Sequence, residues 1–171
     1  LSLDDTPVRV LDPAHPKGVK RGHIWSFVSD EPLVFYEYTP NWQGAAIQEL
    51  LKDYQGTLQG DGYAGLNPLY EKQSAPKRAG CLAHARRKFV AAYQAGDLRV
   101  ARTLQLIQEL YVIERRATDD GCDVTERLRR RQESSVPRMK LLRQELDSLG
   151  NQAPPKTPLG VAITYALRQW N

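Results

Sequence analysis

The sequence has few of the features that mark secreted or membrane proteins. Its 171 residues include only two cysteines, Cys81 and Cys122. Two cysteines do not make a disulfide framework in a chain of this size, so a reducing environment is expected. No window approaches the roughly 18 consecutive apolar residues of a membrane span, and the start lacks the pattern of a secretory signal peptide. The chain also starts without methionine inside an apparent strand, so we expect it to be a piece of a longer protein.

The net charge of +4 hides an uneven distribution. Residues 1–75 carry 6 basic and 10 acidic side chains, whereas residues 76–171 carry 18 basic and 10 acidic ones. An acidic half next to a basic half is typical of a protein with a metal-binding site beside a surface that binds a polyanion. It suits equally a globular protein with an arginine-rich helical surface, and charge alone does not choose between the two.

The first half is predicted to be an α/β sheet. Three strands joined by short, antiparallel connections come first, then a helix, a strand, a short helix and a fifth strand. The expected strands cover residues 1–11, 22–28, 33–38, 57–59 and 79–82, and the helices residues 43–54 and 63–70. This is the order of a ribonuclease-H-like mixed sheet, in which the first and fourth strands are neighbours.

The second half is predicted to be all helical. Asp97 caps a helix that runs to about Ala117, and Thr157-Pro158 caps the last one. That last helix is expected at 159–170, and the others at 83–93, at 124–133 and, after a restart at 134–137, at 138–149. We therefore expect a catalytic core over residues 1–95, and a helical insertion with the start of a C-terminal helical segment over 96–171.

Asp61 is the acid in the most informative position. Gly60-Asp61-Gly62 ends the fourth strand, so the carboxylate projects from the carboxyl edge of the sheet, where α/β folds place ligands. Asp4 lies within the first strand, and Asp5 points to the opposite face. Only one of those two can therefore share a site with Asp61, and a bound cation would explain an acid inside a strand. The alternative is a simple turn at Asp61 and a surface acid pair at Asp4 and Asp5.

A basic helix is predicted to begin just after the fifth strand. Arg86, Arg87 and Lys88 in its first turns are candidates for sequence-independent contacts to phosphates, or else form a solvated helix face. Cys81 and His84 have the spacing of half a zinc site, but its other half is missing unless Cys122 and His15 or His23 complete it. A buried structural cysteine is the plain alternative for Cys81.

Four separated stretches resemble the bacterial DDE transposases of the insertion sequence sixty-six family. They are LDDTPVRVLDP (3–13), GHIWSFV (22–28), LQGDGYAGLN (58–67) and CLAHARRKF (81–89). Residues 155–160 and 162–170 also resemble the family's segment ahead of its last catalytic residue. The resemblance covers nearly the whole chain in the right order, and the Asp-Gly-Tyr and Cys-x-x-His-x-Arg-Arg blocks are specific together.

This resemblance implies an enzyme that cuts DNA at the ends of an insertion element and joins the freed 3′-hydroxyl to target DNA. Asp4 and Asp61 match the family's two catalytic, metal-binding aspartates, and hard Mg²⁺ or Mn²⁺ ions suit such carboxylates. The resemblance implies that Asp5, Cys81 and His84 lie near that site. It also implies that Arg86, Arg87 and Lys88, at the start of the basic helix, contact DNA. The family's third acid, a glutamate, has no match, so we expect it beyond the chain end and this chain alone to be inactive or very weak.

The implied partners are the element ends and the target DNA in the bacterial cytoplasm, at the nucleoid, with a homo-oligomer or other element-encoded proteins as further partners. Two rival functions stay open. One is a non-catalytic DNA-binding or assembly module whose acids are structural caps. The other is a different ribonuclease-H-like nuclease, such as a junction resolvase.

Overall fold

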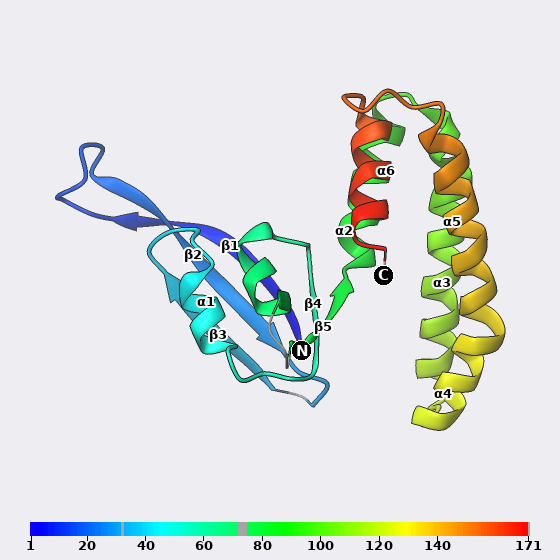
Figure 1. The fold of residues 1–171 in the computed structure, drawn as a ribbon, viewed down its shortest axis with the longest axis horizontal. Helices are drawn as coiled ribbons and strands as arrows, with labels where there is room; N and C mark the ends of the chain where they lie inside the picture. The colour runs from blue at the N-terminus through cyan, green and yellow to red at the C-terminus, as the bar shows by residue number, and fades with distance from the viewer. Residues whose placement is uncertain (32, 72–74, 171) are drawn as a thin grey trace. The chain divides into compact units, whose positions relative to one another are not determined.

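The computed structural model describes residues 1–31, 33–71 and 75–170, which form two compact units (Figure 1). The first unit, Leu1–Cys81, is a mixed sheet with helices, and the second, Leu82–Trp170, is helical. The sequence suggested a boundary after residue 95. The unit boundary lies earlier because the helix that begins at Leu82 contributes Ala85, Phe89 and Ala92 to the core of the helical unit.

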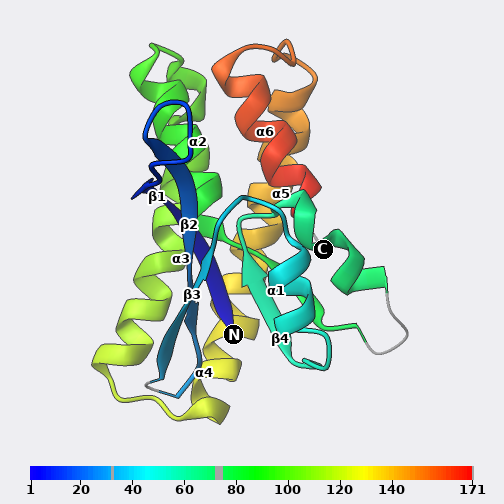
Figure 2. The ribbon, with the colours of Figure 1, turned by 90° about the vertical axis from the view of Figure 1, so that its left-hand side faces the viewer.

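The first unit is a five-stranded sheet in the order β3-β2-β1-β4-β5, which places it in the α/β class. Strands β1 (Ser2–Leu11), β2 (Val19–Val28) and β3 (Val34–Thr39) are antiparallel neighbours. The chain then crosses through α1 (Ala45–Leu50) to β4 (Thr57–Gly60), as Figure 2 shows. A 3₁₀ helix, η1 (Ala64–Glu71), leads to β5 (Lys77–Gly80). Because β4 is parallel to both β1 and β5, the predicted mixed sheet with adjacent first and fourth strands is confirmed.

One face of this sheet carries the core of the first unit. Alternation along β2 buries His23, Trp25 and Phe27, whereas Ile24 and Val28 on the other face are exposed. The aromatic residues pack with apolar side chains from the neighbouring strands, α1 and η1, namely Leu3, Ile47, Leu51, Leu58, Leu66 and Leu69. Burial of these side chains fixes which strand residues face the core and which face away.

The second unit is built from helices, as the sequence predicts. They are α2 (Leu82–Gln94), a short 3₁₀ helix η2 (Leu98–Val100), α3 (Ala101–Asp119), α4 (Val124–Arg130), a π-helical turn η3 (Arg131–Ser135), α5 (Val136–Gly150) and α6 (Pro158–Arg168). Within the unit, α3 packs along α5 and α2 along α6 (Figure 1). The Thr157 hydroxyl accepts a hydrogen bond from the Gly160 N–H at 3.1 Å, so the predicted cap of the last helix is confirmed. Among the described residues, no helix is both long enough and apolar enough to cross a bilayer.

Several predicted boundaries are wrong. The chain does not restart at residues 134–137, because the π-helical turn carries helical structure directly into α5 and Pro137 lies in the first turn of α5, where its missing N–H is tolerated. The fifth strand ends at Gly80 and Leu82 already opens α2. A short apolar run does not distinguish a strand from the start of a helix, which explains that shift. Helix α1 ends at Leu50, short of the predicted Tyr54.

Candidate metal centre and its surroundings

The pairing of β1 with β4 determines where Asp4 and Asp61 lie. These parallel strands pair Ser2 with Gln59, whose side chains also form a hydrogen bond of 3.0 Å. Asp4 and Asp61 each follow two residues later. Because side chains alternate with a period of two, both carboxylates are expected on the same face at the same level.

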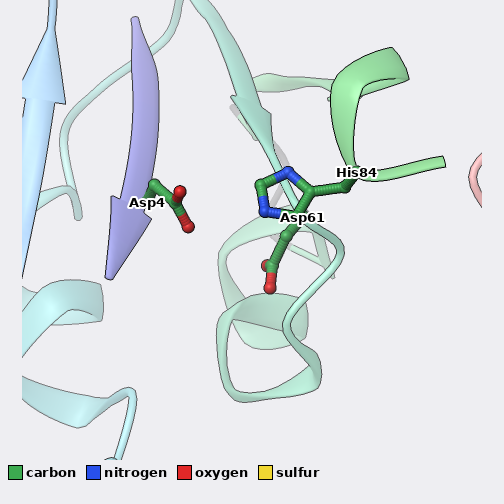
Figure 3. Close-up of side chains that lie close together, drawn as sticks. All are labelled: Asp4, Asp61 and His84. Atoms are coloured by element: carbon green, nitrogen blue, oxygen red, sulfur yellow. The ribbon is translucent and has the colours of Figure 1, made fainter. Parts of the chain in front are cut away.

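The two carboxylates do lie together. Figure 3 shows Asp4 projecting from β1 and Asp61 from the loop that follows β4, and an oxygen of one lies within 4.8 Å of an oxygen of the other. A Mg²⁺ ion at 2.0–2.1 Å from each ligand spans oxygens up to about 4.2 Å apart. Asp4 is exposed, so its side chain has room to rotate toward an ion.

Two carboxylates this close repel each other when both are ionised. At 4–5 Å the repulsion amounts to about 1–4 kcal/mol for effective dielectric constants between 80 and 20. A divalent cation between them would reverse the sign of that interaction. The pair is made only of hard oxygen donors, which are the ligands that Mg²⁺ and Mn²⁺ prefer. The donor set therefore fits the metal that the sequence implies.

Asp61 is held by its own turn. Its Oδ1 accepts a hydrogen bond of 2.9 Å from the Tyr63 N–H. Gly62, between them, has a φ of +81°, a conformation that residues with a side chain rarely adopt. The Gly-Asp-Gly turn of the alternative reading is therefore present, and it orients the carboxylate beside Asp4. A structural turn and a ligand position are compatible here.

Asp5 points to the opposite face of the sheet, as the strand alternation predicts. Its Oδ2 lies 2.6 Å from Nδ1 of His23, and its Oδ1 accepts a hydrogen bond of 3.2 Å from Nε1 of Trp42. Both the His23 and Asp5 side chains are largely buried. Asp5 is thus a neighbour of the site in sequence, but its carboxylate faces the core side and anchors the sheet. The sequence offered His23 as one residue that could complete a zinc site with Cys81 and His84. In the structure its Nδ1 is paired with Asp5 instead.

An aromatic stack links the Asp5 side of the sheet to the Asp61 turn. The Trp42 ring stacks on Tyr63, with ring centroids 4.5 Å apart, and on His23 at 5.9 Å. The Tyr63 hydroxyl donates a hydrogen bond to the Trp42 carbonyl. Burial raises the pKa of the Tyr63 phenol, and the negative charges of Asp5 and Asp61 raise it further, so the phenol stays a proton donor. The sequence did not identify this support, because nothing in the spacing of residues 42 and 63 shows that they meet.

Cys81 and His84 lie at the junction between β5 and α2. The Cys81 N–H donates a hydrogen bond of 3.0 Å to the Gly60 carbonyl, directly before Asp61. His84 is the third residue of α2 and is half-buried. The chain between them is so short that the His84 Cα stays within about 10 Å of the Cys81 Cα. Both Cys81 and Cys122 are free thiols.

The three basic candidates on α2 differ in their surroundings. Arg86 and Arg87 are exposed, and in the described part of the chain neither forms an ion pair. Lys88 is half-buried, and its Nζ lies 4.7 Å from the centroid of the Tyr165 ring on α6. This cation–π contact commits the ammonium group to packing within the helical unit. Arg86 and Arg87 are therefore the more accessible of the predicted DNA contacts.

The mixed sheet and the pair of carboxylates at β1 and just after β4 are the features of a candidate metal-dependent protein. Comparison with known proteins identifies the family. The family described as Transposase IS66 family matches residues 1–171, the whole chain. The protein belongs to this family, as the sequence motifs indicate.

Relatives in Sinorhizobium fredii (strain NBRC 101917 / NGR234) are uncharacterised proteins. The chain is 32% identical to y4jD over 181 residues, which covers 98% of the chain and 35% of the relative. It is 27% identical to y4hP over 176 residues, with 87% and 31% covered. The chain thus spans about a third of the length of these relatives. No solved structure matches the chain significantly.

Proposed function

We propose that this chain is part of the catalytic core of a DDE transposase with a ribonuclease-H-like fold. Asp4 and Asp61 would hold Mg²⁺ or Mn²⁺ for strand cleavage and strand transfer at the ends of an insertion element in bacterial DNA. The observation that carries the proposal is the convergence of these two carboxylates from adjacent parallel strands, in a chain that matches a transposase family from end to end. The strand order is also the one expected for that fold.

Divalent ions held by Asp4 and Asp61 would supply Lewis-acid chemistry for the attacking and leaving oxygens. The two aspartates contribute differently. Asp61 is oriented by the Tyr63 N–H and is half-buried, which makes it the fixed ligand. Asp4 is exposed and can adjust to an ion and to a phosphate. We propose that His84 lies near this site. Only two residues separate it from Cys81, whose N–H donates a hydrogen bond to the carbonyl of Gly60, directly before Asp61.

The test is Mn²⁺ binding to the full chain, followed by the electron paramagnetic resonance signal of the free ion. Loss of a residue that only supports a metal ligand lowers affinity by about 10–100-fold. Asp4→Asn and Asp61→Asn remove ligands themselves, so each is expected to weaken binding at least about tenfold. Asp53→Asn is the matched control, since it removes an exposed carboxylate of the same unit, in the turn between α1 and β4.

Asparagine keeps the oxygen that accepts the Tyr63 N–H, and it is well tolerated in such turns. The variants should therefore unfold at temperatures no lower than the wild type does, which separates loss of the site from loss of the fold. Equal Mn²⁺ affinity in all four proteins would overturn the assignment of the site. The acids would then be structural, and a non-catalytic DNA-binding or assembly role would take the place of the nuclease.

A further inference from the structure

The helical unit has many arginines, and most of those between residues 127 and 143 are neutralised by acids. Arg129 contacts Glu126 at 2.8 Å and Glu133 at 2.6 Å. Arg129 and Arg130 lower the pKa of Glu126 to about 2, so this carboxylate is ionised across the physiological range. The remaining pairs of the group are Arg127 and Arg131 with Glu114, Arg130 with Asp120, Arg138 with Glu109, and Arg143 with Asp147. These arginines form surface ion pairs, some along one helix and others between helices, and they offer little free positive charge.

Arg86 and Arg115 are different. Both are exposed, and within the described ranges neither makes an ion pair or a hydrogen bond through its guanidinium group. They belong to neighbouring helices of one unit, α2 and α3. A concentration of unpaired positive charge on two packed helices marks a surface suited to an anion.

These two arginines line the same groove. It has a volume of about 400 Å³ and is bordered by Ala83 and Arg86 from α2 and by Gln108, Tyr111 and Arg115 from α3. The spacing places each set on one helix face, since residues three, four or seven apart are neighbours along a helix. No lining residue carries a carboxylate, and every polar side chain among them can donate hydrogen bonds.

We propose that this groove binds a backbone phosphate of DNA, with Arg86 and Arg115 as its two anchoring residues. Phosphate oxygens only accept hydrogen bonds, and the planar guanidinium matches them in a bidentate manner. Gln108 adds an amide donor. A contact of this kind positions DNA without reading its sequence. The inference rests on the proposed function in taking DNA as the polyanion, and it adds α3 to the contact surface predicted at the start of α2.

The test compares variants that change charge equally but at arginines in different surroundings. Arg86→Gln and Arg115→Gln remove the unpaired charges, and Arg129→Gln removes one that two acids already neutralise. Affinity of the full chain for a 30-base-pair duplex of arbitrary sequence is measured as a function of salt concentration, in the presence of a chelator. Each phosphate contact contributes a slope of about 0.9 in log affinity against log salt, which is about eightfold in affinity at 0.1 M.

Arg86→Gln and Arg115→Gln are each expected to weaken binding about eightfold and to lower the salt slope by about one. Arg129→Gln is expected to change affinity by less than about twofold. Equal losses in all three variants, or none in Arg86→Gln and Arg115→Gln, would overturn the proposal. Because no metal is present, failure of the metal site leaves this result unaffected. The Mn²⁺ affinity of Arg86→Gln and Arg115→Gln should equal that of the wild type.

Discussion

Replacing Asp61 with asparagine in the complete gene product is expected to lower metal-dependent DNA strand cleavage by at least about 100-fold. Residues that merely support a metal ligand already contribute about 10–100-fold, and Asp61 is proposed as the better fixed of the two ligands. Asp4→Asn should cause a loss of the same order, because both carboxylates are proposed to hold the same ions. The measurement is cleavage of a labelled duplex that carries the element end, in Mg²⁺.

The double variant makes this prediction sharper. Residues that act as a unit are strongly non-additive, so Asp4→Asn combined with Asp61→Asn should be hardly worse than either change alone. Asp53→Asn should retain full activity. Losses that multiply in the double variant would mean that the two acids act independently, which contradicts a shared metal site.

The second large effect is expected one residue away, at Asp5, and on stability instead of activity. Asp5→Ala leaves two donors without their acceptor, Nδ1–H of His23 and Nε1–H of Trp42. The His23 donor is buried, whereas Trp42 is exposed and water can satisfy its Nε1–H. An unsatisfied buried donor costs about 1–3 kcal/mol, so the free energy of unfolding of the first unit should fall by about that amount. Asp4→Ala, on the exposed face, should not lower it, because the Asp4 side chain is exposed and the change removes the repulsion between Asp4 and Asp61.

Urea unfolding followed by tryptophan fluorescence measures this difference, since Trp25 and Trp42 both report on the first unit. Asp5→Asn, which keeps one acceptor oxygen, should give an intermediate loss. Similar destabilisation by Asp4→Ala and Asp5→Ala would show that the alternation along β1 is not the one described. The neighbouring aspartates should thus separate into one that serves metal binding and one that serves the fold.

The sheet was largely predictable from the sequence, because its strands are rich in apolar and aromatic residues that alternate and end at clear turns. The adjacency of the first and fourth strands followed from the strand order, and it led to the pairing of Asp4 with Asp61. The end of β5 and the start of α2 were not predictable, since the apolar run at residues 79–82 fits either element.

The support behind the site was also beyond sequence reasoning. The pairing of Asp5 with His23 depends on the register of the β1–β2 hairpin, in which Asp5 faces Trp25 and Pro7 faces His23. The loop of residues 12–18 contains no two-residue turn that would determine that register. The groove between Arg86 and Arg115 requires α2 and α3 to pack together, a tertiary contact that no local pattern encodes.

The most direct test of the central claim is anomalous diffraction from crystals of the chain grown in Mn²⁺. The account predicts a peak within about 2.5 Å of a carboxylate oxygen of both Asp4 and Asp61, and its loss in Asp61→Asn crystals. Manganese bound only at other acids, with the Asp4 and Asp61 carboxylates in contact with solvent alone, would contradict it.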